Sequence, residues 1–294
     1  MDAALVERVR SFNRTVTQRV GALSDRYLAR DRPLGEARLL WEIGAEGCEV
    51  RSLRSRLGLD SGHASRLLRA LEQDGMVRVA PSPLDGRIRV AQLTRPGLAE
   101  RALLDRRSDD LAASLLTSLR PEQREEIVAA MNTVERLLTS AAIEIRTTDP
   151  RAADARRCLR AYFAELDRRS DTSYDPAAGV SAEPHEMTPP AGRFLVAYLR
   201  GEPVACGGVK HHPGEPSDIK RMWVAESARG AGLGRRLLAE LEADARRSGA
   251  QATRLETNRV LVEAIGLYRS AGYAEVPAFN DEPFGDHWFQ KRLA

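Results

Sequence analysis

Apolar residues recur every three or four positions through most of the first half of the chain, and this spacing predicts amphipathic helices. We expect one helix at about residues 34–41, a short second helix at 50–57 and a third helix that ends at Gly75. Either Asp60 or Ser61 is suited to cap the third helix. The first half of the chain is therefore predicted to be mainly helical.

The pattern changes after the third helix, where apolar and polar residues alternate as they do in strands. The alternation runs through residues 76–80, turns at Asp85–Gly86 and returns through 88–94, which predicts a β-hairpin with an Asp-Gly tip. Three helices followed by a hairpin is the order of a winged helix-turn-helix, whose exposed helix enters the major groove of DNA. Residues 51–95 hold nine arginines against four acids, and this excess favours a polyanionic partner.

The third helix and the hairpin also resemble the MarR family of bacterial transcription regulators. The resemblance rests on the helix end at residues 71–76 and on the hairpin, where Asp85 and Arg87 match the family's Asp-x-Arg. It implies that Arg87 enters the minor groove while Asp85 holds a basic side chain of the domain.

Several side chains are expected on the side that faces a double-stranded DNA operator. They are Ser61, His63, Ser65, Arg66, Arg69, Asp85, Arg87 and Arg89. The alternative is that these arginines form only a solvated face, and His63 is equally well explained as an ordinary surface histidine.

The helices that flank this region carry apolar stripes, and each stripe requires a partner surface. One stripe comprises Val6, Val9, Phe12, Val16, Val20 and Leu23, and the other comprises Leu111, Leu115, Leu119, Ile127, Met131, Val134 and Leu138. MarR-like proteins use such terminal helices to form a two-fold dimer, so the resemblance implies a homodimer that reads a palindromic operator. A helical core within one chain would explain the stripes equally well.

The character of the sequence changes near residue 142, and we expect residues 1–141 and 142–294 to be separate domains. Strand and helix patterns follow one another in the second domain, interrupted by a loop at residues 170–192 that is rich in Ser, Asp, Pro and Gly. A polar strand at 218–224 then leads through a glycine-rich turn into a helix. The fold class predicted for the whole chain is multidomain, α followed by α/β.

The glycine-rich turn has the features of an anion-binding site. Gly230, Gly232 and Gly234 allow the backbone to approach a ligand closely, and the helix that follows adds the positive end of its dipole. A Walker loop requires Lys and then Ser or Thr after the last glycine, whereas Arg235 and Arg236 follow here. A dinucleotide-binding fold would place its glycines in the first strand–helix unit of a domain, whereas this turn lies late in its domain. Neither of these two folds therefore accounts for the turn.

The turn resembles the Arg/Gln-x-x-Gly-x-Gly/Ala turn of the GNAT superfamily of N-acetyltransferases. Residues 252–273, which end in Leu-Tyr-x-x-x-Gly-Tyr, are similar to the next strand and helix of that family. The resemblance implies a GNAT fold with a mixed central sheet and acetyl-CoA as the cosubstrate. The residues that it assigns to acetyl-CoA are Met222, Trp223, Val224, Arg229, Gly230, Ala231, Gly232, Leu233, Gly234 and Arg235. Many relatives carry an asparagine where this chain has Leu261, and Asn258 is the residue expected to substitute for it.

Acetyl transfer requires an amine that has lost its proton, a stabilised oxyanion and a proton for the leaving thiolate. By resemblance, Tyr268 is the general acid, and Asp218 lies where some members carry a glutamate base. Tyr268 could instead only pack through its ring, and Asp218 could be a surface acid at a strand end. Glu215, Glu256 and the acids of the loop at 170–192 are competing bases.

Cysteines, histidines and hydrophobic segments indicate the cellular compartment and whether metal or membrane binding is expected. The three cysteines, at 48, 158 and 206, are too scattered for a metal site and odd in number for a disulfide framework, so a reducing cytoplasm fits best. His211 and His212 lack a third ligand at suitable spacing, and no metal is expected. No segment approaches the length of a membrane span.

These patterns predict a regulator that binds DNA and also transfers an acetyl group from acetyl-CoA to a small amine or amino acid. One alternative keeps the acetyl-CoA pocket as a sensor that controls operator affinity without catalysis. The other is a plain acetyltransferase whose helical domain only dimerises.

Overall fold

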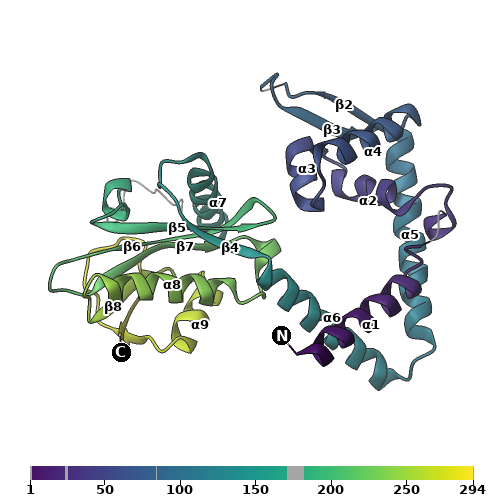
Figure 1. Ribbon diagram of the computed structural model, residues 1–294. Coiled ribbons are helices and arrows are strands. Elements are labelled where there is room, and N and C mark those ends of the chain that lie inside the picture. Colours follow the sequence, from purple (N-terminus) through teal and green to yellow (C-terminus); the bar gives the residue numbers. More distant parts are fainter. Residues whose placement is uncertain (1, 24–25, 84, 171–181, 294) are drawn as a thin grey trace. The chain divides into compact units, whose positions relative to one another are not determined.

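The computed structural model describes residues 2–23, 26–83, 85–170 and 182–293, so residues 171–181 of the predicted loop lie outside the described part. The chain forms two compact units, Met1–Met131 and Asn132–Ala294 (Figure 1). Helix α6 (Pro121–Ala141) crosses the limit between them. None of the helices described is both long and apolar enough to cross a membrane.

The first unit contains the predicted winged helix-turn-helix. Its elements are α2 (Leu34–Ile43), β1 (Cys48–Glu49), α3 (Val50–Leu57), α4 (Ser61–Gln73), β2 (Val77–Pro81) and β3 (Arg89–Leu93), and the strands form a sheet in the order β1-β3-β2. Asp60 caps α4, because its carboxylate accepts the N–H of His63 at 2.8 Å. Gly75 follows α4 with a φ of 70°. The predicted Asp-Gly tip belongs to a longer loop, in which the N–H of Ser82 donates to the carbonyl of Ile88 at 2.7 Å.

The remaining helices are α1 (Ala3–Arg19), the short η1 (Tyr27–Ala29) and α5 (Arg95–Thr117), together with α6. The apolar stripes of α1 and α6 are largely exposed, whereas Tyr27 of η1 and Leu104 of α5 are buried in the core of the first unit. Phe12 is 51% exposed, Met131 is 52% exposed and Leu138 is 67% exposed. No described residue of α1 or α6 is buried, which disfavours a core formed by these stripes within one chain.

The second unit is built on a seven-stranded sheet. Its elements are β4 (Ile143–Thr147), α7 (Ala153–Arg169), η2 (Pro184–Met187), β5 (Gly192–Leu199), β6 (Glu202–Lys210), β7 (Ser217–Val224), η3 (Glu226–Ala228), α8 (Leu233–Arg247), β8 (Ala252–Thr257), α9 (Val262–Ser270), β9 (Ala274–Val276) and β10 (His287–Arg292). The strand order is β4-β5-β6-β7-β8-β10-β9. Only the β7–β8 pair is parallel among the described strands, which confirms the predicted α/β fold with a mixed sheet.

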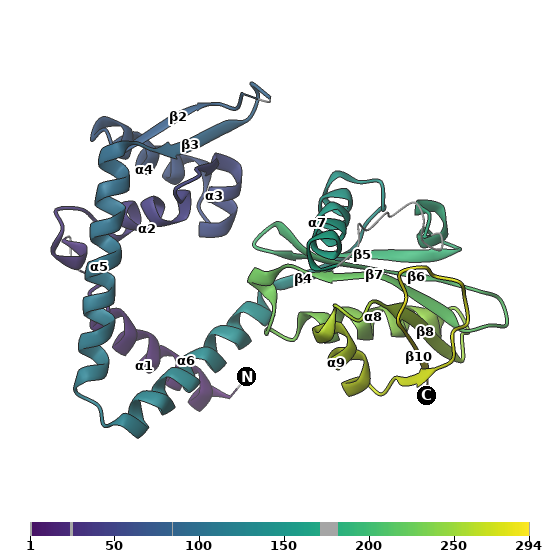
Figure 2. The same ribbon diagram turned by 180° about the vertical axis from the view of Figure 1, so that it is seen from behind.

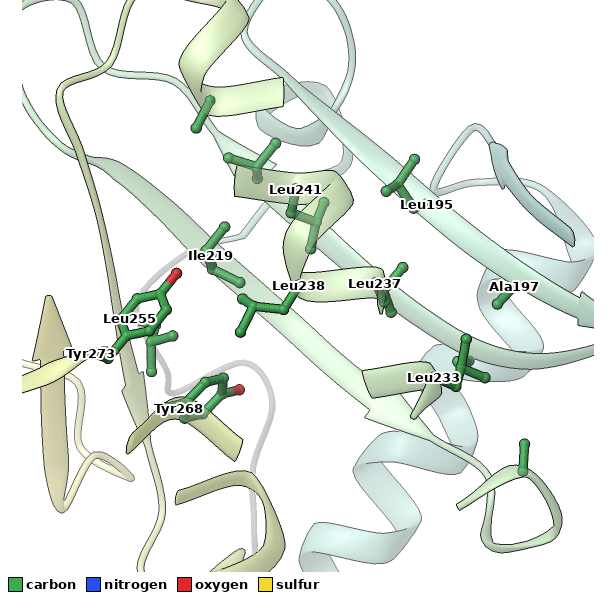
Figure 3. Close-up of a cluster of buried hydrophobic side chains, with 14 of the residues drawn as sticks. Leu195, Ala197, Ile219, Leu233, Leu237, Leu238, Leu241, Leu255, Tyr268 and Tyr273 are labelled. Atoms are coloured by element: carbon green, nitrogen blue, oxygen red, sulfur yellow. The ribbon is translucent and has the colours of Figure 1, made fainter. Parts of the chain in front are cut away.

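Helices cover both faces of this sheet, with α7 on one face and α8 and α9 on the other (Figure 1, Figure 2). Alternation along the strands fixes this arrangement, because successive side chains point to opposite faces. Val196 packs in the cluster that contains Cys158 of α7, whereas Leu195 belongs to the cluster of α8 and α9. Figure 3 shows the second cluster, in which Leu238 of α8 lies near Tyr268 and Tyr273.

The sheet opens where β7 and β8 diverge. These strands pair at their beginnings, Ser217 with Thr253 and Asp218 with Arg254. Further along, β7 contains a bulge, in which two residues, Arg221 and Met222, oppose Gly207 alone on β6. Arg221 has a φ of 57°, which is a strained conformation for a residue with a side chain. The bulge therefore lies beside the opening between the two parallel strands.

Candidate functional site

The glycine-rich turn forms the predicted cradle at the beginning of α8. Gly230 and Gly232 both have a φ of 77°, and Gly232 is the N-cap of the helix. A Cβ atom at either glycine would meet no protein atom within 4 Å, so open space lies against the backbone there. No side chain of the described residues caps this helix end. Its first N–H groups therefore remain available to an anion, and the helix dipole favours negative charge at the same place.

A pocket of about 430 Å³ lies against this cradle. Its lining contains most of the predicted acetyl-CoA residues, namely Met222, Trp223, Val224, Arg229, Gly230, Gly232, Leu233, Gly234 and Arg235. Ala231 is buried and is not part of the lining. The volume falls in the range of pockets that enclose small ligands. We call this space the cradle pocket.

Arg229 and Arg235, the two arginines predicted to bind acetyl-CoA, make hydrogen bonds within the protein. Arg229 donates from Nε to the carbonyl of Val224 at 3.0 Å and from Nη2 to the carboxylate of Glu165 at 2.6 Å. Arg235 donates to the hydroxyl of Ser270 at 2.7 Å, which links the beginning of α8 to the end of α9. In this structure the cradle thus offers an anion mainly backbone N–H groups.

A second pocket lies between the diverging strands. It is lined by residues 219–222 of β7, by residues 256–258 and by Glu282 and Phe284, and we call it the inner pocket. Asn258 lines this pocket and not the cradle pocket, because its amide donates to the carbonyl of Phe284 at 2.9 Å. The role of Asn258 as a substitute cofactor contact stays a prediction, and its position is beside the inner pocket.

The two pockets meet at Tyr268. This residue lines both of them, together with Tyr162, Met222 and Leu261. It lies on α9, its side chain is shown in Figure 3, and it is only 5% exposed. Burial raises its pKa above the usual value, and the negative charge of Glu256 raises it further. The hydroxyl consequently retains its proton and is a donor at neutral pH.

Asp218 lies apart from this junction. It is at the beginning of β7, where the sheet is still closed, and it lines neither pocket. Its carboxylate accepts from Nε of Arg254 at 2.7 Å and lies 3.2 Å from Nε2 of His212. The structure therefore does not bring Asp218 together with Tyr268. Glu215, another acid considered from the sequence, lies 3.4 Å from Arg254 in the same group of charges.

Glu256, in contrast, lines the inner pocket. Its side chain is 10% exposed and forms an ion pair with Lys220, which is 5% exposed. The amide of Asn280 also donates to Glu256 at 3.3 Å, and Asn280 is held by the indole N–H of Trp288 at 2.8 Å. Neither Lys220 nor Asn280 was predicted from the sequence as a site residue. The sequence contains only three lysines, and this rarity could have drawn attention to Lys220. The other two, Lys210 and Lys291, also pair with glutamates.

All eight residues predicted to face DNA are exposed in the first unit, six of them on α4 or β3. They are Ser61, His63, Ser65, Arg66 and Arg69 on α4, Asp85 and Arg87 in the loop of the hairpin, and Arg89 on β3. The Asp85 carboxylate accepts the backbone N–H of Arg87 at 2.9 Å. Asp85 thus shapes the loop that presents Arg87.

The chain thus combines an α/β domain that contains two pockets with a winged helix-turn-helix domain. The family description "MarR family" matches residues 31–88, and "Acetyltransferase (GNAT) domain" matches residues 190–275. The chain belongs to the GNAT acetyltransferases and carries a MarR family domain in its first unit.

Relatives of known sequence agree with the acetyltransferase assignment. An IAA acetyltransferase of Azospirillum brasilense is 37% identical over 122 residues, which cover 41% of this chain and 78% of that protein. YjgM of Escherichia coli (strain K12), an uncharacterised N-acetyltransferase, is 31% identical over 124 residues, which cover 41% of this chain and 74% of that protein. A GNAT family acetyltransferase of Staphylococcus aureus Mu50 is a similar solved structure, with 16% identity, a TM-score of 0.45 and coverage of 52% of this chain and 100% of that one.

Proposed function

We propose that the protein binds operator DNA as a homodimer and also transfers an acetyl group from acetyl-CoA to a small amine or amino acid. The observation that carries the enzymatic half is the junction at Tyr268 of two pockets, one against an open anion cradle and the other lined by ionisable side chains. The regulatory half is supported by the exposed basic face on a MarR family domain. Such a protein belongs in the cytoplasm, where acetyl-CoA and DNA are both present.

The cradle pocket fits the phosphate-bearing part of acetyl-CoA. The backbone N–H groups of residues 230–234 would hold the pyrophosphate, and the β7 edge at Met222–Val224 would bind the pantetheine arm and the thioester oxygen. The bound cosubstrate supplies an acyl group activated as a thioester. The open space beside Gly230 and Gly232 is what allows a ligand to reach this backbone.

The inner pocket would receive the amine, and two of its residues have suitable proton chemistry. We assign Tyr268 as the general acid, since it lines both pockets and its hydroxyl is protonated at neutral pH. Glu256 is the acid that we assign as general base, because it lies in the same pocket and is held by Lys220 and Asn280. It would accept the proton of the attacking amine directly or through one water. Asp218 receives no such role, because it lies outside both pockets.

The exposed apolar stripes support the homodimer. Apolar surface as extensive as that of α1 and α6 is unusual on a monomer and favours a second copy as its cover. A two-fold dimer would present two α4 helices to the two halves of a palindromic operator.

Two measurements on the purified full chain test this proposal. Release of CoA thiol from acetyl-CoA is measured across a panel of amines and amino acids, and binding to genomic DNA fragments is measured at several salt concentrations. Turnover with at least one acceptor and salt-dependent binding to selected fragments are expected. Binding of acetyl-CoA without any turnover, together with altered DNA affinity, would replace the enzyme with a sensor. Turnover without DNA binding would reduce the first unit to a dimerisation domain.

A further inference from the structure

Glu165 on α7 is a buried acid in the wall of the cradle pocket, although acetyl-CoA is a polyanion. The residue is 8% exposed. A negative charge near bound phosphates opposes their binding, so its presence requires an explanation. The contacts of its carboxylate provide one.

Both ends of the segment that leads into the cradle donate to this one carboxylate. The indole N–H of Trp223 donates to Oε2 at 2.9 Å. The Nη2 group of Arg229 donates to both oxygens, at 2.6 and 2.7 Å. Arg229 also donates to the carbonyl of Val224, so its guanidinium bridges the end of β7 and helix α7. Glu165 thereby connects the β7 edge and the beginning of the glycine turn to a helix on the opposite face of the sheet.

The charge of Glu165 is maintained by these donors. Burial alone would raise its pKa, but the hydrogen bonds from Arg229 and Trp223 outweigh burial and lower the pKa below the usual value. Arg169 adds a further contact at 2.9 Å and itself reaches Glu263 on α9 at 2.8 Å. A charge that is buried and fully paired in this way is a strong geometric restraint.

We infer that Glu165 is a positioning residue for acetyl-CoA. It holds the segment from Trp223 to Arg229 in the conformation that presents the backbone N–H groups of the cradle. This inference rests on the proposed binding of acetyl-CoA. It predicts that removing a negative charge from the wall of a polyanion site weakens polyanion binding, which is opposite to the simple electrostatic effect.

The direction in which Glu165→Gln changes acetyl-CoA affinity tests the inference. Glu165→Gln preserves size and can still accept from Trp223, whereas Glu202→Gln removes a surface acid that pairs with Arg157 of the same helix and serves as the matched control. Acetyl-CoA affinity is measured by calorimetry on the full-length protein, and kcat and KM are measured with whichever acceptor the wild type uses. We expect Glu165→Gln to weaken binding and raise KM by about tenfold, with a much smaller change in kcat and no change for Glu202→Gln.

A second variant tests the same contacts in case Glu165→Gln does not fold. Trp223→Phe removes one donor to Glu165 and keeps an aromatic ring, and it should raise KM in the same direction by a smaller factor. Combining Glu165→Gln with Arg229→Gln should add little to the loss of Arg229→Gln alone, since the two side chains act mainly through the hydrogen bonds that join them. Unchanged or tighter acetyl-CoA binding by Glu165→Gln would overturn the inference while leaving the proposed function intact. Absence of acetyl-CoA binding by the wild type would overturn both.

Discussion

The Nε group of Arg254 on β8 donates to the carboxylate of Asp218 on β7 over 2.7 Å. The pair closes the two parallel strands at the end where they are still hydrogen-bonded, and the inner pocket begins beyond it. Asp218 is 7% exposed, so the contact is largely shielded from water. Its position indicates that Asp218 holds the strands together at the base of the opening.

Asp218→Asn should therefore affect stability more than catalysis. The amide keeps the size of the side chain but loses the charge that pairs with Arg254, which should lower the free energy of unfolding by about 1–3 kcal/mol. The acidic limb of the kcat–pH profile should keep its position and slope. Glu256→Gln is the comparison, because loss of the proposed base should lower kcat and flatten that limb. Flattening by Asp218→Asn instead would restore Asp218 as the base.

Tyr268→Phe should lower kcat while acetyl-CoA affinity is retained. The ring continues to fill its place between the two pockets, but no hydroxyl remains to protonate the thiolate. A fall of roughly 10²- to 10⁴-fold is expected if general-acid catalysis is lost entirely. Calorimetry with acetyl-CoA and steady-state kinetics separate the two effects. Equal kcat values for the variant and the wild type would limit Tyr268 to packing.

The pH dependence of the wild type gives an independent check on Tyr268. Its pKa is raised above the ordinary 10.0, so the proton donor is present throughout the neutral range. The raised pKa also means that the neutral ring contributes stability that is complete below about pH 10 and is lost as the pH rises through the folded-state pKa. We expect kcat to show no loss from this group below pH 10 and the unfolding midpoint to fall above it. Tyr268→Phe should reduce that alkaline fall.

The sequence predicted the parts of the fold that depend on local pattern. The hairpin at residues 76–94 follows from alternation and was found in the structure. A cap at Asp60 or Ser61 was also predicted, and the structure shows Asp60 in that position. The glycine turn was equally readable, because positive φ at Gly230 and Gly232 is a property of the residue type.

The charge partners at the site could not be read from the chain in the same way. Glu165 meets Arg229 across 64 positions, and Lys220 meets Glu256 across 36, so only the folded sheet brings them together. The register of β7 also decides which acid reaches the opening. Asp218 has the spacing of a family base, yet the bulge at Arg221 and the divergence from β8 begin after it.

Gly232→Val should remove acetyl-CoA binding. The new side chain would occupy the open space against the cradle backbone, and the φ of 77° adds strain of about 1–2 kcal/mol. Gly214→Val is the matched control, since Gly214 has a φ of 78° with equally open surroundings and lies outside the cradle pocket. Both variants should lose similar stability in thermal melts, but only Gly232→Val should lose binding by calorimetry. Normal binding by Gly232→Val would place the phosphates elsewhere.

Arg66→Ala combined with Arg87→Ala should weaken DNA binding and leave acetyl transfer unchanged. Each arginine is exposed on the proposed reading face, and each specific contact is worth about 1–3 kcal/mol. The slope of log K against log salt should also fall by about 1 for each phosphate contact that is lost. Arg246→Ala with Arg247→Ala removes the same charge from α8 of the second unit and should change neither quantity. Equal binding by both double variants would contradict the winged-helix assignment.

Met131→Glu combined with Leu138→Glu should convert the proposed homodimer into a monomer. Two carboxylates in the apolar stripe of α6 would have to lose their hydration in the dimer, whereas in the single chain both positions are more than half exposed. The fold of each unit should therefore survive, and sedimentation or light scattering should report the lower mass. Leu98→Glu, at an exposed position of α5 outside both stripes, controls for added charge. Because one subunit presents a single α4, operator affinity should fall with dimer content, and acetyl-CoA turnover should not. A dimer that persists in the double variant would show that the stripes are covered in another way.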